Sequence, residues 1–169
     1  MEEGFRITNL RVGAVDIEGE KVWRDDNTVE GRPDSITINL LQNGVFFKSQ
    51  TISENDNWRF SFENLDEFDE NGVAYTYTVK EDEVPEGYES TAEGYDIINV
   101  RTGTTSAEGS KTWVDENEND RPDSITVNLL QNGIVIDTQE VTVEDNWSYI
   151  FEDLDQFDEN GVEYEYTIS

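Results

Sequence analysis

The sequence contains no cysteine and no histidine among its 169 residues, and it has 11 basic side chains against 40 acidic ones. Without cysteine a chain has neither disulfides nor thiolate chemistry, and without histidine it lacks the commonest metal ligand and general base. The net charge of −29 offers no basic footprint for nucleic acid and disfavours contact with an anionic membrane. We therefore expect no nucleic-acid or membrane partner, no cofactor or metal, and no enzyme acting on an external substrate.

The sequence also shows no secretory signal, no apolar run long enough to span a bilayer and no lipidation motif. These features leave two expectations, a cytosolic protein or an internal fragment of a longer one. Disorder is disfavoured, because four Trp, seven Tyr and eight Phe occur in regular alternation, which disordered acidic chains do not show.

Two-residue alternation predicts strands in which three polar side chains point inward. Lys21 shares the parity of the apolar positions in VDIEGEKVW, and Glu81 shares that of the tyrosines in AYTYTVKE. Asn99 likewise falls on the apolar face of GYDIIN, and Asn9 does so in the earlier copy GFRITN. A lysine, a glutamate and an asparagine are therefore expected in the core of one domain.

An internal repeat organises the chain. The segment from GEKVW onward recurs from GSKTW onward, with Lys21 matching Lys111 at an offset of 90 and later positions at 89. We expect a complete repeat at 14–101, a second repeat at 102–169 that lacks its closing strand, and at 1–13 the closing strand of a preceding repeat plus a linker. Such a pattern predicts a window cut from a longer array.

Each repeat is predicted to be all-β. SITINLL and SITVNLL alternate as strands, and each runs into an Asn-Gly pair, the strongest short hairpin signal. Further strands are expected at Trp58 to Phe62 and Val73 to Val79, around a turn at Asp69 to Gly72, and Pro85 with Gly87 breaks the next connection. About seven short strands in each repeat, without helical periodicity, favour a two-sheet sandwich.

Several motifs together resemble a known family. KVW with its Asp/Asn-rich loop, RPDSITINLLQNG, NW, YTYTVKE, GYES and the closing IIN are similar to the B-type repeat domains of collagen-adhesin (Cna) surface proteins of Gram-positive bacteria. The resemblance implies an inverse immunoglobulin-like, prealbumin-like sandwich. It also implies a spontaneous Lys-Asn isopeptide bond between first and last strands, with Lys21 and Asn99 joined and Glu81 assisting.

Burial explains how such a bond could form. Desolvation lowers the pKa of a lysine and raises that of a glutamate, which yields a nucleophilic amine and an acid able to polarise the amide. Folding holds the groups in contact at high effective concentration. The alternative is a buried Lys-Glu ion pair with an asparagine that caps a loop. Lys111 and Asn9 lack partners in this sequence, so we expect them to remain an unreacted amine and an unreacted amide.

The acidic loops and the tryptophans have simpler interpretations. DENEND at Asp115 to Asp120 and DEFDENG at Asp66 to Gly72 resemble calcium loops only weakly. When the DENG stretch is aligned with a calcium loop, it lacks an Asp at the first position of that loop and has Thr78 at the twelfth, where the loop has Glu. Solvated turns are favoured over calcium sites. Trp58 and Trp147 are expected to be core residues in strands rather than platforms for carbohydrate.

These features predict a structural function: extracellular stalk or spacer domains of a cell-wall-anchored adhesin, covalently self-locked, with neighbouring repeats of the parent chain as partners. The alternative is a surface module that binds a host ligand or calcium directly; an exposed apolar patch would favour it, and an unbroken acidic surface the spacer. Phe5 to Asn9 is expected to act as a spare strand that completes the second repeat of a neighbouring chain, which predicts head-to-tail association.

Overall fold

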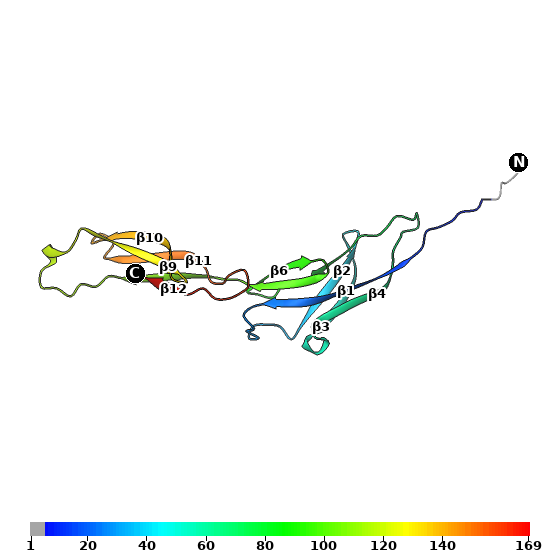
Figure 1. Cartoon of the computed structure of the whole chain (residues 1–169), viewed down its shortest axis with the longest axis horizontal. Helices are drawn as coiled ribbons and strands as arrows, with labels where there is room; N and C mark the ends of the chain where they lie inside the picture. Colours follow the sequence, from blue (N-terminus) through cyan, green and yellow to red (C-terminus); the bar gives the residue numbers. More distant parts are fainter. Residues whose placement is uncertain (1–5) are drawn as a thin grey trace. The chain divides into compact units, whose positions relative to one another are not determined.

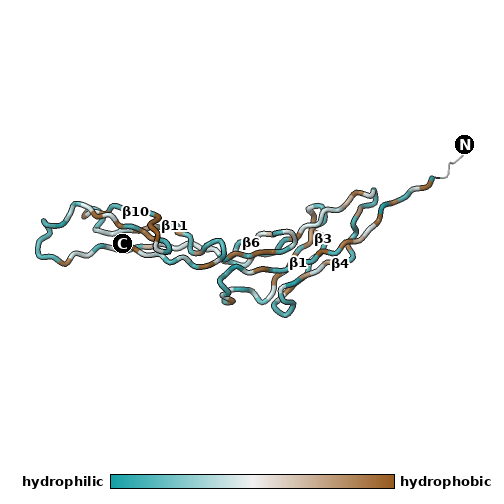
Figure 2. Tube along the Cα trace, viewed as in Figure 1, coloured by the Kyte–Doolittle hydropathy of each residue, from teal (hydrophilic) through white to brown (hydrophobic). Residues whose placement is uncertain are grey.

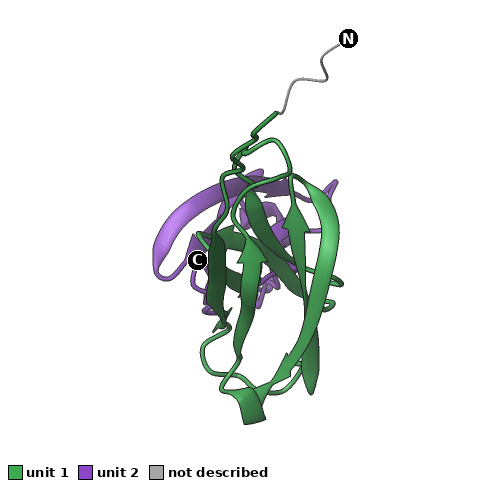
Figure 3. Ribbon diagram, turned by 90° about the vertical axis from the view of Figure 1, so that its right-hand side faces the viewer, with its two compact units in different colours: residues 1–100 green, residues 101–169 purple. Residues whose placement is uncertain are grey.

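Residues 6–169 are described by the computed structural model, and within that range the chain forms no α-helix. It divides into two compact units, Met1–Val100 and Arg101–Ser169 (Figure 3). The predicted all-β fold class is confirmed. The division falls next to the predicted boundary between the two repeats.

The first unit is a sandwich of two β-sheets (Figure 1), in which the pairs β1-β4, β2-β3 and β2-β5 are antiparallel. One sheet has the order β4-β1-β7-β6 and the other has the order β3-β2-β5. The strands are β1 Ala14–Arg24, β2 Ser35–Gln42, β3 Val45–Ser53, β4 Arg59–Asp66, β5 Tyr77–Glu81, β6 Tyr88–Glu93 and β7 Asp96–Arg101, with a 3-10 turn, η1, at Glu54–Asp56. The first and last strands lie side by side, because β1 pairs in parallel with β7.

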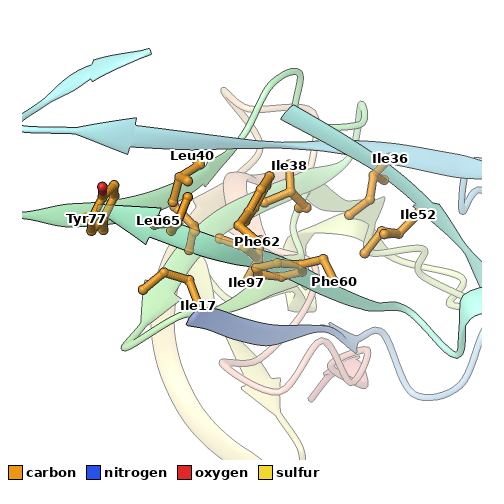
Figure 4. Packing of buried hydrophobic residues seen from close by; sticks show 11 residues of the cluster. Ile17, Ile36, Ile38, Leu40, Ile52, Phe60, Phe62, Leu65, Tyr77 and Ile97 are labelled. Carbon is orange, nitrogen blue, oxygen red and sulfur yellow. The ribbon is translucent and has the colours of Figure 1, made fainter. Parts of the chain in front are cut away.

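Alternating apolar side chains from both sheets form the core of this unit (Figure 4). Hydrophobic positions lie within strands such as β1, β3 and β10, whereas the long loops are mostly hydrophilic (Figure 2). Each fully buried large apolar side chain stabilises the fold by about 1.5–3 kcal/mol. The buried cluster comprises Ile17, Ile36, Ile38, Leu40, Ile52, Phe60, Phe62, Leu65, Tyr77, Val79 and Ile97.

The predicted Asn-Gly hairpin is confirmed between β2 and β3. Asn43 and Gly44 have φ values of 50° and 80°, which is the pair of positive angles that a tight two-residue hairpin requires. The Asn43 side chain also accepts a hydrogen bond from the backbone N–H of Thr76. The second unit repeats the turn at Asn132 and Gly133, with φ values of 49° and 82°.

Three predicted strand placements were wrong. Trp58 has a φ of 56° and lies in the turn before β4, with its side chain packed against the core. Trp147 adopts the same left-handed conformation, with a φ of 59°. The predicted strand from Val73 begins only at Tyr77, because the backbone before it closes a turn in which Asp69 N–H donates to the Val73 carbonyl.

The second unit contains β8 Thr104–Ser110, β9 Ser124–Gln131, β10 Ile134–Thr142, β11 Ser148–Asp155 and β12 Tyr166–Ile168, with a 3-10 turn, η2, at Glu118–Asp120. Its sheets have the orders β10-β9-β12 and β11-β8. Its core is smaller and consists of Val127, Leu129, Val141, Trp147 and Phe151. Because β8 has β11 as its one neighbour in this sheet order, it pairs along one edge only within the described residues.

The segment before β1 forms no strand in its described part. Residues 6–13 are exposed, including Asn9, and Ile7 has 90% of its surface accessible. Phe5, the first residue of the predicted spare strand, lies outside the described residues. The segment contacts the first unit only near its end, where the Glu67 N–H donates to the Gly13 carbonyl and Cζ of Arg11 lies 4.2 Å from the centre of the Phe68 ring.

Candidate cross-linking site

Lys21, Glu81 and Asn99 are all buried, as the alternation predicts, with exposed fractions of 4%, 6% and 0%. Lys21 lies in β1 and Asn99 in β7, and the parallel register pairs Lys21 with Ile97 and Trp23 with Asn99. Paired residues share a face of the sheet. The amine and the amide therefore occupy diagonal positions on the inward face of neighbouring strands.

Glu81 reaches the same region from the opposite sheet. It ends β5, where it pairs with Ile38 of the central strand β2. Its carboxylate influences the ionisation of Lys21, and both Lys21 and Asn99 influence its own. The fold thus brings together three polar side chains that are up to 78 positions apart in the sequence.

Burial changes the ionisation of both titratable groups. It lowers the pKa of Lys21 from 10.5 to about 7, against the opposing charge of Glu81. Burial also raises the pKa of Glu81, although the nearby Asn99 amide and the Lys21 charge favour the carboxylate. These shifts move Lys21 towards the uncharged amine and Glu81 towards the uncharged acid, the forms that amide substitution needs.

The site contains buried polar atoms whose hydrogen bonds are unmade. Neither oxygen of Glu81 and neither amide atom of Asn99 has a hydrogen-bond partner in the described part of the chain. The Asn99 amide is near enough to lower the pKa of Glu81, but the two side chains do not form a hydrogen bond. Among the described residues, the Lys21 ammonium nitrogen donates one hydrogen bond, to the Val22 carbonyl at 3.2 Å. Each such orphaned group costs about 1–3 kcal/mol, which is unusual in a core that serves stability alone.

The alternative arrangement is not observed among residues 6–169. No ion pair joins Lys21 to Glu81 there, since the ion pairs of the described residues involve Asp25, Glu20, Asp115 and Glu118. Asn99 lies within β7 and caps no loop. The three side chains are therefore close together, but no ion pair or hydrogen bond joins them to one another in this range.

An aromatic residue packs beside the amine, and sequence reasoning missed its charged neighbours. The Lys21 ammonium nitrogen lies 4.2 Å from the centre of the Trp23 ring, and Trp23 contacts Trp58 and Tyr88 edge-on. Just beyond this ring, the fully buried Asp25 pairs with an arginine of the following loop. The available signal was the recurrence of an aspartate and an arginine around both Asp/Asn-rich loops.

Residues 17–100 and 107–169 match the family described as the Cna protein B-type domain. The chain belongs to this family.

The curated relative of this B-type chain is a collagen adhesin of Staphylococcus aureus, 36% identical over 174 residues, which include 99% of this chain and 14% of the relative. The chain thus spans about one seventh of that protein. A crystal structure of a single B repeat unit of the S. aureus collagen-binding surface protein is 34% identical, with a TM-score of 0.50, and covers 93% of this chain and 85% of that one.

A second crystal structure, of two B repeat units of the same S. aureus protein, is 34% identical with a TM-score of 0.50. It covers 92% of this chain, but the chain covers only 44% of it. Together with the single-unit match, this means that the two B-type domains of the chain correspond to about one B repeat unit of that protein.

The two remaining motif residues of the B-type domains have no partner of the predicted kind among residues 6–169. Lys111 follows the end of β8, is exposed, and places its ammonium nitrogen 5.0 Å from the centre of the Trp113 ring. Asn9 is exposed in the segment before β1. That both stay unreacted remains a prediction.

The acidic loops of the B-type domains use their carboxylates locally. The Asp69 side chain accepts hydrogen bonds from the backbone N–H groups of Asn71 and Val73 and so closes its own turn. Among the described residues no group of three or more His, Cys, Asp or Glu side chains is placed to hold a metal ion. None of the described residues belongs to a helix long and apolar enough to cross a membrane.

Proposed function

We propose that this chain is a stalk or spacer segment of an extracellular, cell-wall-anchored adhesin, and that its first domain is locked by an isopeptide bond between Lys21 and Asn99. The B-type family and the surface-adhesin relatives support the first part. The buried trio supports the second. The complete domain would span 14–101 and the second, without its closing strand, 102–169, after the closing strand of a preceding repeat and a linker at 1–13. Neighbouring repeats of the parent chain would be the partners.

The reaction would be an amide exchange that needs no co-reactant. The uncharged amine of Lys21 attacks the side-chain carbonyl carbon of Asn99, a new C–N bond forms, and the bond from that carbon to Nδ2 breaks. One amine proton passes through the Glu81 carboxyl to the departing nitrogen, which leaves as ammonia. No electrons are transferred, and Glu81 ends in the state in which it began.

One observation supports this chemistry above the others: the cluster of buried atoms with unmade hydrogen bonds at Glu81 and Asn99. A new amide N–H at Lys21 would give an oxygen of the Glu81 side chain a donor. The loss of the Lys21 charge would also remove the cost of keeping an ammonium in the core. The product therefore relieves penalties that the unreacted site carries.

Intact mass spectrometry tests the proposal. The purified chain should weigh one ammonia less than its sequence mass, and peptide mapping should find Lys21 joined to Asn99. Glu81→Gln should restore the sequence mass. Lys111→Arg and Asn9→Ala are matched controls that should keep the loss of one ammonia. A wild-type chain at its full sequence mass contradicts the cross-link.

A second candidate function is direct ligand binding, which exposed apolar residues favour. Val45, Phe46 and Phe47 are exposed at the start of β3, and Ile134, Val135 and Ile136 are exposed at the equivalent start of β10. Because the relative is named for collagen, immobilised collagen is the first ligand to test. Binding that is lost in a Phe46→Ser, Ile134→Ser chain would support this function, and no binding by the wild type supports the spacer.

A further inference from the structure

A charged cluster lies next to the site, on the loop that follows β1. Asp25 is fully buried, and its two carboxylate oxygens accept hydrogen bonds from Nε and Nη2 of Arg32, both at 2.6 Å. The Tyr88 hydroxyl donates a third hydrogen bond to Asp25, at 3.0 Å. A buried carboxylate is tolerated only with such full pairing, so the pair fixes this loop against β6.

The pair also holds its guanidinium close to the reactive lysine. Cζ of Arg32 lies 5.5 Å from the centre of the Trp23 ring, and the Lys21 ammonium nitrogen lies 4.2 Å from the same centre. Two cations against one partly buried ring repel each other. Arginine cannot give up its proton in a protein, whereas lysine can, so Lys21 is the group that becomes neutral.

We propose that Asp25 and Arg32 are positioning residues for the cross-linking reaction: the buried carboxylate anchors the guanidinium at Trp23, and the guanidinium favours the uncharged amine of Lys21. This inference rests on the proposed function of the site. It assigns a role to a loop whose Asp/Asn-rich sequence otherwise suggests only a solvated turn.

The charges that face Lys21 act in opposite directions. Glu81 from β5 and Asp25 from the loop raise its pKa, whereas burial and Arg32 lower it, and the effect of Arg32 exceeds that of Asp25. The Tyr88 hydroxyl of β6 donates to the Asp25 carboxylate of the pair. Arg32 is thus the one charged neighbour, among the described residues that affect Lys21, that assists burial in keeping the amine neutral.

The second domain contains the same pair and provides a control within the chain. Arg121 binds Asp115 through two hydrogen bonds, at 2.8 and 2.9 Å, and its Cζ lies 5.8 Å from the centre of the Trp113 ring. Here the side chains are 23% and 27% exposed, compared with 16% for Arg32 and 0% for Asp25. Lys111 is exposed as well, so removal of Arg121 should leave the cross-linking site unaffected.

Titration of the lysine amines by NMR tests the electrostatic part in an Asn99→Ala chain, which cannot form the bond. The midpoint of Lys21 should be near 7, and Arg32→Gln should raise it by roughly one unit. Arg32→Lys retains the charge and should leave the midpoint nearly unchanged, as should Arg121→Gln. An unmoved midpoint in Arg32→Gln overturns the inference.

A double variant guards against misfolding. Arg32→Gln alone leaves the Asp25 carboxylate buried without its ion-pair partner, so Asp25→Asn with Arg32→Gln removes both charges while retaining hydrogen-bonding groups. Its Lys21 midpoint should rise by less than in Arg32→Gln, because the opposing charge of Asp25 is removed too. A midpoint at or below that of the parent chain in a folded double variant also overturns the inference.

The rate of bond formation tests the functional part. Chain isolated in denaturant before it has folded is diluted into buffers from acidic to alkaline pH, and intact mass is followed over time. Arg32→Gln should move the rate profile to higher pH, with a loss of about fivefold at pH 7 that alkaline buffer restores. A merely structural role would slow the reaction at every pH without moving the profile.

The two hypotheses fail in different ways. Ammonia loss in the wild type with an unmoved profile in Arg32→Gln overturns the role of the pair alone. A wild-type chain that never loses ammonia overturns the proposed cross-link, and a moved Lys21 midpoint in the Asn99→Ala chain then still supports control of the amine by Arg32.

Discussion

The two domains share their sequence motifs but treat the motif lysine differently. Lys21 lies inside an 11-residue strand that pairs with β4 on one edge and β7 on the other. Lys111 follows a seven-residue strand that pairs with β11 alone in the part of the chain described. The K-x-W motif therefore does not bury its lysine by itself. The buried lysine has a parallel neighbour strand, β7, that has no counterpart beside β8 among the described residues.

The largest expected difference between the domains is stability. A bond between Lys21 and Asn99 closes nearly the whole first domain, which in a chain-entropy estimate stabilises it by about 4–5 kcal/mol. Glu81→Gln should remove this gain, and the first domain should then unfold in denaturant and yield to protease much nearer the second. Lys111→Arg is the control. If both wild-type domains unfold together, the lock contributes nothing.

Equivalent core truncations should sharpen the same comparison. Leu40 and Leu129 are both fully buried, and replacement of such a leucine by alanine costs about 2–5 kcal/mol. Leu129→Ala should unfold the second domain at room temperature, whereas Leu40→Ala should leave the locked first domain folded. Hydrogen exchange of each domain measures the outcome. Equal protection in the two variants would contradict a lock restricted to the first domain.

The unlocked first domain should also depend on pH in a way the second does not. In Asn99→Ala, Lys21 has a pKa near 7 when folded and its ordinary value when unfolded. The unfolded chain therefore binds more protons between about pH 7 and 10, and stability rises with pH there by up to about 1.4 kcal/mol per unit. The raised pKa of Glu81 has the opposite effect. Above the ordinary pKa of a glutamate the folded chain holds more protons on Glu81 than the unfolded chain does, so stability falls as pH rises from that value.

Denaturant midpoints of the Asn99→Ala chain across this range provide the measurement. Lys21→Met in the same chain should remove the rise above neutral pH. A rise that persists without Lys21 would assign the dependence to another group.

Substitution of the hairpin glycines should destabilise both domains equally. Gly44 and Gly133 have φ values of 80° and 82°, and a Cβ at Gly44 or Gly133 would meet no atom within 4 Å, so alanine adds only backbone strain. We expect Gly44→Ala and Gly133→Ala to cost about 1–2 kcal/mol each. Thermal melts of each variant measure the loss. Unequal losses would show that the lock also stiffens the turn.

Self-association should give the smallest effect. The free edge of β8 could accept an extended segment from residues 5–9 of another chain, of which Phe5 lies outside the described residues. Light scattering over a concentration series should show head-to-tail association that deletion of residues 1–9 abolishes. A strict monomer at all concentrations rules this out.

The site was predictable where strand parity is unbroken, and less so where loops intervene. Lys21 and Glu81 lie in strands whose alternation survives, so their inward orientation follows from sequence alone. Tyr95 shares the parity of Asn99 yet is 37% exposed, because it lies in the turn between β6 and β7.

The loop residues could not be predicted from the sequence for a different reason. Trp58 and Trp147 adopt left-handed conformations after an asparagine, and an Asn-Trp pair before a strand gives no sign of this. The pairing of Asp25 with Arg32 depends on how the loop folds over β1, since a run of acidic and amide residues is equally typical of a solvated turn.

The parallel neighbours β1 and β7 also determine how the first domain would transmit tension. The chain enters at the start of β1 and leaves at the end of β7, so a pull on its ends runs along these two strands. With the proposed bond between them, the polypeptide from residue 22 to residue 98 would withhold roughly 250 Å of contour length. Such a domain acts as an inextensible link, and a tether built from it would keep its reach under load.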